Sequence, residues 1–238
     1  MGLLALAIAP GIAICIFIYF KDKYNKEPIG LLITSFLLGM LATIPAVIVQ
    51  LLYGTSLDTL SKEGTGAVAI FAYAVVAFSE EGSKFMMLRL FAYPKKAFDD
   101  PFDGIIYAVM VGMGFATLEN ILYVMQNGVG TGILRMFLSV PAHATFAILM
   151  GYYVGLAKFD PVNRRYNFFL AILLPILFHG TFDFFLFLGN SMLHFAGSVA
   201  SFIVAVYLSR RAISKKQALS KAFMAGIDII SNQDNSLI

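Results

Sequence analysis

Two adjacent glutamates and a lysine interrupt an otherwise apolar stretch of the chain, VVAFSEEGSKFMMLRL (75–90). Glu80 and Lys84 are four residues apart, so on a helix they share one face, where the ammonium can neutralise a carboxylate. Glu81 lies about 100° further round the helix and can face a different neighbour. Two adjacent carboxylates in a medium of low dielectric constant cannot both ionise cheaply, and a carboxyl group tuned in this way suits a general acid or base. The pair is therefore a candidate for activating water.

Two histidines lie in equally apolar stretches. His179 and Asp183, in FHGTFDFF, are again four residues apart, so the aspartate can hold the imidazole in one tautomer. His143 lies in a further stretch, and Glu119 lies in GMGFATLEN. No serine or cysteine has a convincing base partner, which disfavours a covalent nucleophile. The candidate catalytic residues, with Lys84 as the tuning ion-pair partner, are Glu80, Glu81, Glu119, His143, His179 and Asp183.

The composition places these groups in a membrane. The 238 residues are 59% hydrophobic and only 13% charged, with a mean hydropathy of +0.81, whereas soluble domains carry about 25% charged residues. Apolar runs such as LLALAIAPGIAICIFIYF do not alternate, which favours membrane helices over a β-barrel. Seven helical spans are expected, at roughly 3–20, 29–53, 66–91, 104–126, 133–157, 167–189 and 193–209.

We therefore predict an all-α integral membrane protein, a polytopic bundle of about seven transmembrane helices. The bundle is expected to occupy residues 1–209 as a single domain, with its catalytic core at about 66–189. Residues 210–238 are expected to form a basic cytoplasmic tail.

The basic residues predict the orientation of the bundle. Of the 17 Lys and Arg residues, thirteen fall in alternate loops and the tail, one (Lys62) falls in the intervening loops, and three lie within spans. Because Lys and Arg gather in cytoplasmic loops, the N-terminus is expected outside and the C-terminus in the cytoplasm. The basic clusters are short and each flanks a helix, so they indicate contact with the lipid bilayer and no binding of nucleic acid.

The buried ionisable groups converge in depth. At about 1.5 Å per helical residue, all six candidates lie within roughly 8 Å of the centre of the bilayer. Ionisable groups inside a membrane are costly, so they are usually paired, turned inward and functional. Four helices that each contribute such groups at one depth indicate one buried site.

The motifs and their order resemble those of the PrsW family of bacterial intramembrane proteases, which belongs to a wider group with the CAAX prenyl proteases and bacteriocin-processing proteins. The resemblance rests on E-E-x-x-K (80–84), on F-x-x-x-E-N (115–120), on the mid-span His143 and on H-x-x-x-D (179–183). It departs from the CAAX pattern at Glu119, where a histidine would be expected, and in the shorter spacing of the basic residue. Both departures fit PrsW-like members and disfavour a prenylated substrate.

The resemblance implies a multi-pass protease of the bacterial cytoplasmic membrane. It implies an endopeptidase that cuts a single-span, membrane-anchored protein, namely an anti-sigma factor at the first cut of a stress-signalling cascade. Glu80 or Glu81 would be the general base, and His179 would polarise the scissile carbonyl.

Two versions of this chemistry remain open. In one, a carboxylate and a histidine activate water without a metal. In the other, Zn²⁺ is bound by candidates His143, His179 and Glu119 or another carboxylate. The zinc motif H-E-x-x-H is absent from the sequence, which favours the metal-free version.

Two other functions use the same residues. Buried Glu, His and Lys at mid-membrane also occur in proton-coupled transporters, although the chain shows no inverted repeat. A non-catalytic membrane scaffold, in which the polar cluster only fixes packing, is the remaining alternative.

Overall fold

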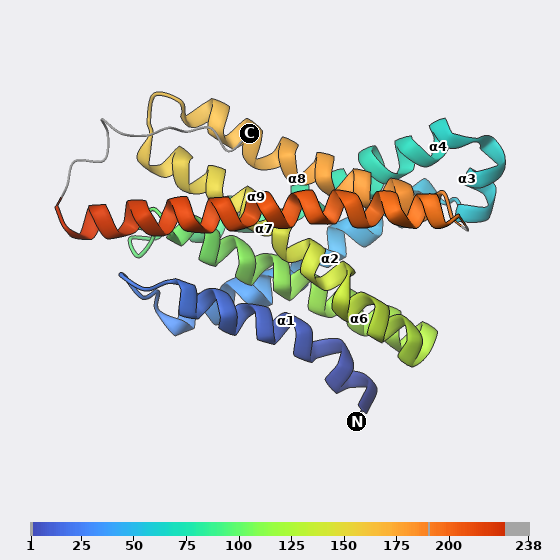
Figure 1. Cartoon of the computed structure of the whole chain (residues 1–238), viewed down its shortest axis with the longest axis horizontal. Coiled ribbons are helices and arrows are strands. Elements are labelled where there is room, and N and C mark those ends of the chain that lie inside the picture. Colours follow the sequence, from blue (N-terminus) through green and yellow to red (C-terminus); the bar gives the residue numbers. More distant parts are fainter. Residues whose placement is uncertain (1, 190, 227–238) are drawn as a thin grey trace.

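The computed structural model describes residues 2–189 and 191–226, and in these ranges every regular element is a helix. Figure 1 shows them as an elongated bundle, with α9 running along its length. The elements are α1 (Gly2–Lys21), α2 (Ile29–Tyr53), α3 (Leu57–Glu63), α4 (Thr65–Ile70), η1 (Phe71–Ala77), α5 (Phe78–Met87), η2 (Leu88–Ala92), α6 (Asp103–Phe137), α7 (Ser139–Phe159), α8 (Arg164–Phe187) and α9 (Met192–Met224).

The prediction of a multi-pass helical membrane protein is confirmed. Five stretches of the described chain are long and apolar enough to cross a membrane, and one of them, Asp103–Phe159, contains both α6 and α7. The expected span at 66–91 is helical, as the consecutive segments α4, η1, α5 and η2. The number of seven crossings and the orientation of the termini stay predictions.

Helix α7 is the centre of the bundle. Every residue from Ala142 to Ala157 is buried, although surface helices of soluble proteins expose one face. Small residues allow α6 to approach on one side, because a side chain at Gly104 would clash with the backbone of Gly151. Gly114 lies in the same way against the backbone of Phe36 in α2. Such close backbone contacts are typical of helix packing in membranes.

The chain reverses direction within α6. Gly128 has a φ of 79°, a conformation that glycine adopts without strain. An unbroken helix would separate residues 119 and 135 by about 24 Å, yet Arg135 Nη2 lies 2.8 Å from Glu119 Oε2. Residues after Gly128 therefore fold back along the first part of α6. The expected loop at 127–132 is helical apart from this one residue, because a single glycine is enough to turn the chain.

Segments with an expected cytoplasmic location meet at one end of the bundle. Asn25 Nδ2 donates to Asp99 Oδ1 (2.7 Å), and Lys158 Nζ donates to the carbonyl oxygen of Tyr93 (2.8 Å). Ser220 Oγ donates to Asp100 Oδ2 (2.6 Å), so the first part of the expected tail packs against the same loop. Helix α9 continues through residue 209 to Met224, and positions 227–238 of the tail lie outside the described residues.

The other end of the molecule carries α3, α4 and the beginning of α9 (Figure 1). Two of the loops that were expected outside, at 54–65 and 190–192, adjoin these elements. The expected outer loops together hold one basic residue, Lys62, which lies in α3. The two ends thus differ in charge in the way that the sequence predicts.

Candidate active site

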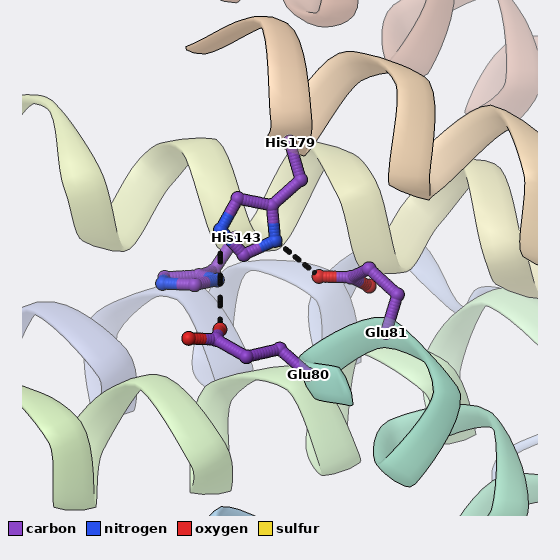
Figure 2. Close-up of side chains that lie close together, drawn as sticks. All are labelled: Glu80, Glu81, His143 and His179. Carbon is purple, nitrogen blue, oxygen red and sulfur yellow. Dashed lines mark hydrogen bonds and ion pairs between the residues drawn. The ribbon is translucent and has the colours of Figure 1, made fainter. Parts of the chain in front are cut away.

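The candidate residues come from four helices that meet at one site, namely α5, α6, α7 and α8. Glu80 and Glu81 lie in α5, His143 in α7 and His179 in α8, and Figure 2 shows their side chains pointing toward one another. The π-helical segment η1 directly precedes α5, and π-helical turns often occur at functional sites.

Glu81 is the most deeply buried member, with none of its surface exposed. Its Oε1 accepts a hydrogen bond from Lys84 Nζ (2.7 Å) and lies 2.8 Å from His179 Nδ1. Its Oε2 is buried and has no hydrogen-bond partner among the described residues. Glu81 therefore links α5 to α8 through Oε1, while its Oε2 makes no hydrogen bond to the described residues.

Glu80 has weaker contacts than its neighbour. Its Oε2 lies 3.4 Å from Lys84 Nζ and 3.9 Å from His179 Nε2. Its Oε1 accepts from Gln50 Nε2 of α2 at 3.2 Å. Lys84 is thus closer to Glu81 than to Glu80, although the helical spacing pointed first to Glu80.

His179 lies between two carboxylates. Its Nδ1 faces Glu81, and its Nε2 lies 3.2 Å from Asp183 Oδ2. The ring stacks on Phe146, with 5.0 Å between the ring centroids and 18° between the planes. Both ring nitrogens can therefore donate to acceptors that the fold holds in place.

Glu119 lies behind His143 rather than beside the glutamate pair. Its Oε2 is 2.9 Å from His143 Nε2 and accepts from Arg135 Nη2 at 2.8 Å. The other nitrogen of the imidazole, Nδ1, lies 3.3 Å from Lys84 Nζ. His143 thus links Glu119 to the group on α5.

A cavity of about 350 Å³ opens onto this site. The polar side chains that line it include Glu80 but neither Glu81 nor Lys84. They are Gln50, Glu80, Glu119, Tyr123, Thr131, Arg135, Ser139, His143, His179 and Asp183. Much of the remaining wall is aromatic, with Phe71, Phe146, Phe182 and Phe187. At about 30 Å³ per molecule, the cavity has room for roughly ten waters. Of the two adjacent glutamates, only Glu80 can meet them directly.

Four side chains could together hold a metal ion. One ligand atom each from Glu80, Glu81, His143 and His179 lie within 4.8 Å of one another. This group contains two of the expected candidates, His143 and His179, but not Glu119. Imidazole and carboxylate ligands suit Zn²⁺.

Two contributors were not assigned a role from the sequence. Arg135 was visible as a basic residue within a span, but its contact with Glu119 depends on the reversal at Gly128. Gln50 gave no signal, because a neutral amide near the end of an apolar helix is unremarkable in sequence.

Known proteins resemble this chain in sequence over most of its length. Residues 27–209 match the family described as "PrsW family intramembrane metalloprotease". The chain belongs to the PrsW family of intramembrane proteases. The PrsW relatives include "Protease PrsW" of Geobacillus kaustophilus, which is 40% identical over 76% of this chain and 78% of its own. "Protease PrsW" of Bacillus subtilis is 37% identical over 78% and 83%, and that of Oceanobacillus iheyensis is 37% identical over 89% and 96%.

No solved structure matches the chain significantly. Membership of the PrsW family and the membrane-spanning helices make the chain a multi-pass bacterial membrane protein. The resemblance inferred from the motifs is thereby confirmed.

Proposed function

We propose that the chain hydrolyses a peptide bond in a membrane-anchored protein, with Glu80 as the group that activates water. The observation that carries this proposal is the shared cavity. Glu80, His143 and His179 line one cavity of about 350 Å³ within the bundle, whereas Glu81 and Lys84 are not among the residues that line it. A general base must reach the water that it deprotonates. Of the neighbouring pair Glu80 and Glu81, only Glu80 lines the cavity and can do so.

The remaining groups position His179 and stabilise the buried carboxylates. Glu81 and Asp183 hold His179 through both ring nitrogens, which fixes the ring beside the cavity, where an imidazolium would stabilise the developing oxyanion through its charge. The ammonium of Lys84 offsets the two adjacent carboxylates, which could not otherwise be buried together. The aromatic wall limits the number of waters near the reacting bond.

The same donors fit Zn²⁺ in type, and one ligand atom from each lies within 4.8 Å of the others. Glu80, Glu81, His143 and His179 would hold the ion, which would supply a Lewis acid for the carbonyl and the water. The ammonium of Lys84 already bonds Glu81 Oε1 and faces His143 Nδ1, so it competes for those atoms. We retain the metal-free version as the proposal and make chelation its test.

The substrate that we propose is a single-span, anti-sigma-factor-like protein, cut near the extracytoplasmic side. The cavity supports this side, because its lining comes from chain next to the expected outer loops. Gln50 precedes the loop that carries Lys62, Phe71 follows it, and Phe187 ends α8 shortly before the next outer loop.

The test uses purified full-length protein in detergent and a panel of single-span membrane proteins. Wild type should cut at least one of them, and Glu80→Gln should reduce the rate by roughly 10²–10⁴-fold, the usual contribution of a general base. Glu63→Gln, an exposed glutamate in α3, is the matched control and should retain full activity.

A folded Glu80→Gln variant that cleaves at the wild-type rate would refute the role of Glu80. Cleavage that is lost with a chelator and restored by Zn²⁺ would replace the metal-free version with the metal-dependent one. Wild type that cuts no member of the panel would contradict the proposed substrate class.

A further inference from the structure

The segment that returns after Gly128 brings a fixed guanidinium to the back of the site. Arg135 Nε donates to Asn120 Oδ1 (3.0 Å) and Nη2 donates to Glu119 Oε2 (2.8 Å). Asn120 in turn donates from Nδ2 to the carbonyl oxygen of Ala7 in α1 (2.8 Å). The guanidinium also lies 4.2 Å from the centroid of the Tyr123 ring. It is therefore held by two acceptors and an aromatic face, and its position is set by the fold.

This guanidinium determines how Glu119 meets His143. One oxygen, Oε2, lies 2.8 Å from Arg135 Nη2 and 2.9 Å from His143 Nε2. A carboxylate that is paired with arginine acts as an acceptor only. The proton of the imidazole is then required on Nε2.

The contact of His143 Nδ1, on the opposite side of the ring, also requires the proton on Nε2. His143 Nδ1 lies 3.3 Å from the ammonium of Lys84. An ammonium has three donors and no acceptor, so Nδ1 must present its lone pair. The environment of His179 differs, because both of its nitrogens face carboxylates. The two histidines therefore differ in which ring nitrogens face an acceptor: only Nε2 in His143, and both nitrogens in His179.

We propose that Arg135 is a positioning residue which, through Glu119, fixes His143 as the Nε2–H tautomer with Nδ1 turned toward Lys84 and the glutamate pair. Glu119 then serves to orient His143, where the sequence had suggested a group acting on the substrate. The effect on catalysis rests on the proposed protease function, but the tautomer does not. The hydrogen bond made by one ring nitrogen sets the state of the other.

The tautomer can be measured without a substrate. The chain has only three histidines, so long-range ¹H–¹⁵N correlation spectra of histidine-labelled protein in detergent can be assigned with single His179→Asn and His194→Asn variants. We expect wild-type His143 to carry its proton on Nε2, with or without a chelator. A proton on Nδ1, or on both nitrogens, would overturn the proposal.

Substitution of Arg135 then tests the cause. Arg135→Met removes all five donors, and we expect the His143 signals to change to a mixture of tautomers. Arg135→Lys keeps a cation beside Glu119 and should restore the wild-type pattern. Arg89→Met is the matched control, since that guanidinium stacks on Tyr93 and Phe168 at 4.4 and 4.9 Å. Unchanged His143 signals in folded Arg135→Met would refute the link, and if that variant does not fold, the wild-type spectrum still decides.

The catalytic consequence is read from steady-state kinetics on a cleaved substrate. Loss of a residue that orients a site histidine typically costs about 10–100-fold in activity, and we expect this loss in kcat with a smaller change in KM. Arg135→Lys should recover most of it. Equal kcat for Arg135→Met and wild type would contradict the positioning role. If wild type cuts nothing, the proposed function fails while the tautomer result still stands.

Discussion

The charge balance around Lys84 makes a quantitative prediction. The ammonium is almost fully buried, bonds Glu81 at 2.7 Å, lies 3.4 Å from Glu80 and sits 4.0 Å from the centroid of the Phe115 ring. Removing one partner of a buried ion pair leaves an uncompensated charge and costs about 3–5 kcal/mol. Lys84→Met keeps most of the side-chain volume, so we expect that cost without a large cavity. The midpoint of thermal unfolding should fall by on the order of 10 °C.

A second substitution tests whether the charge itself is the cause. Glu81→Gln combined with Lys84→Met removes the negative charge that the lysine had balanced, and it should recover about 1.5–3 kcal/mol, the value of a hydrogen bond to a charged group. Glu80→Gln should recover less, because its lysine contact is longer and its carboxylate meets the cavity. The double-mutant cycle gives the coupling energy of each pair.

The chain contains its own reporter for this assay. Its one cysteine, Cys15, is buried in α1, so a thiol-reactive fluorophore labels it as the bundle unfolds. Glu63→Gln, which changes an exposed carboxylate, should leave the midpoint unchanged. If Lys84→Met unfolded at the wild-type temperature, or if Glu80→Gln compensated better than Glu81→Gln, the assigned pairing would be wrong.

Three further outcomes follow from the structure. Gly128→Ala should cost about 1–3 kcal/mol, because its φ of 79° strains any residue with a Cβ; Gly130→Ala, where a Cβ meets open space, is its control in the same unfolding assay. Gly114→Leu should prevent α2 from packing on α6, since even a Cβ would clash with the backbone of Phe36; a monodisperse, wild-type-like protein in size-exclusion chromatography would contradict this. Burial raises the pKa of Glu27 from 4.5 to about 7, so the folded protein holds this proton more tightly than the unfolded chain does. The free energy of unfolding should therefore fall as pH rises from about 5 to 8. Glu27→Gln should remove about 2 kcal/mol of that change, and an unaltered pH profile in this variant would refute it.

The sequence predicted which residues come together better than it predicted the contacts among them. Residues spaced four apart on one helix, such as His179 and Asp183, were assigned correctly as neighbours because helical geometry fixes them locally. Depth in the bilayer then brought Glu80 and His143 to the same level. Neither argument could separate Glu80 from Glu81, since the burial of each depends on the packing of α5 against other helices.

Contacts that depend on chain reversal were not accessible in the same way. Arg135 meets Glu119 only because the chain turns at Gly128 alone and is helical again at once, whereas a loop was expected through residue 132. The acidic groups at the basic end were also missed: Asp22 and Glu27 lie between the expected spans at 3–20 and 29–53 and were assigned no role, yet both are buried. Burial raises the pKa of Asp22 from 3.8 to about 6, in the same direction as that of Glu27.

The burial of Glu80 limits the form in which a polypeptide can reach it. Glu80 is 4% exposed, and the backbone of an α-helix lies inside a sheath of side chains about 10 Å across, with its carbonyl oxygens already hydrogen-bonded. A membrane-anchored segment would therefore have to lose its helical hydrogen bonds around the scissile bond before a water beside Glu80 could attack it. The energy of that local melting becomes part of the barrier to cleavage. Glycine, proline or serine near the cut would lower this energy. The local helix stability of the substrate would therefore select the bond that is broken.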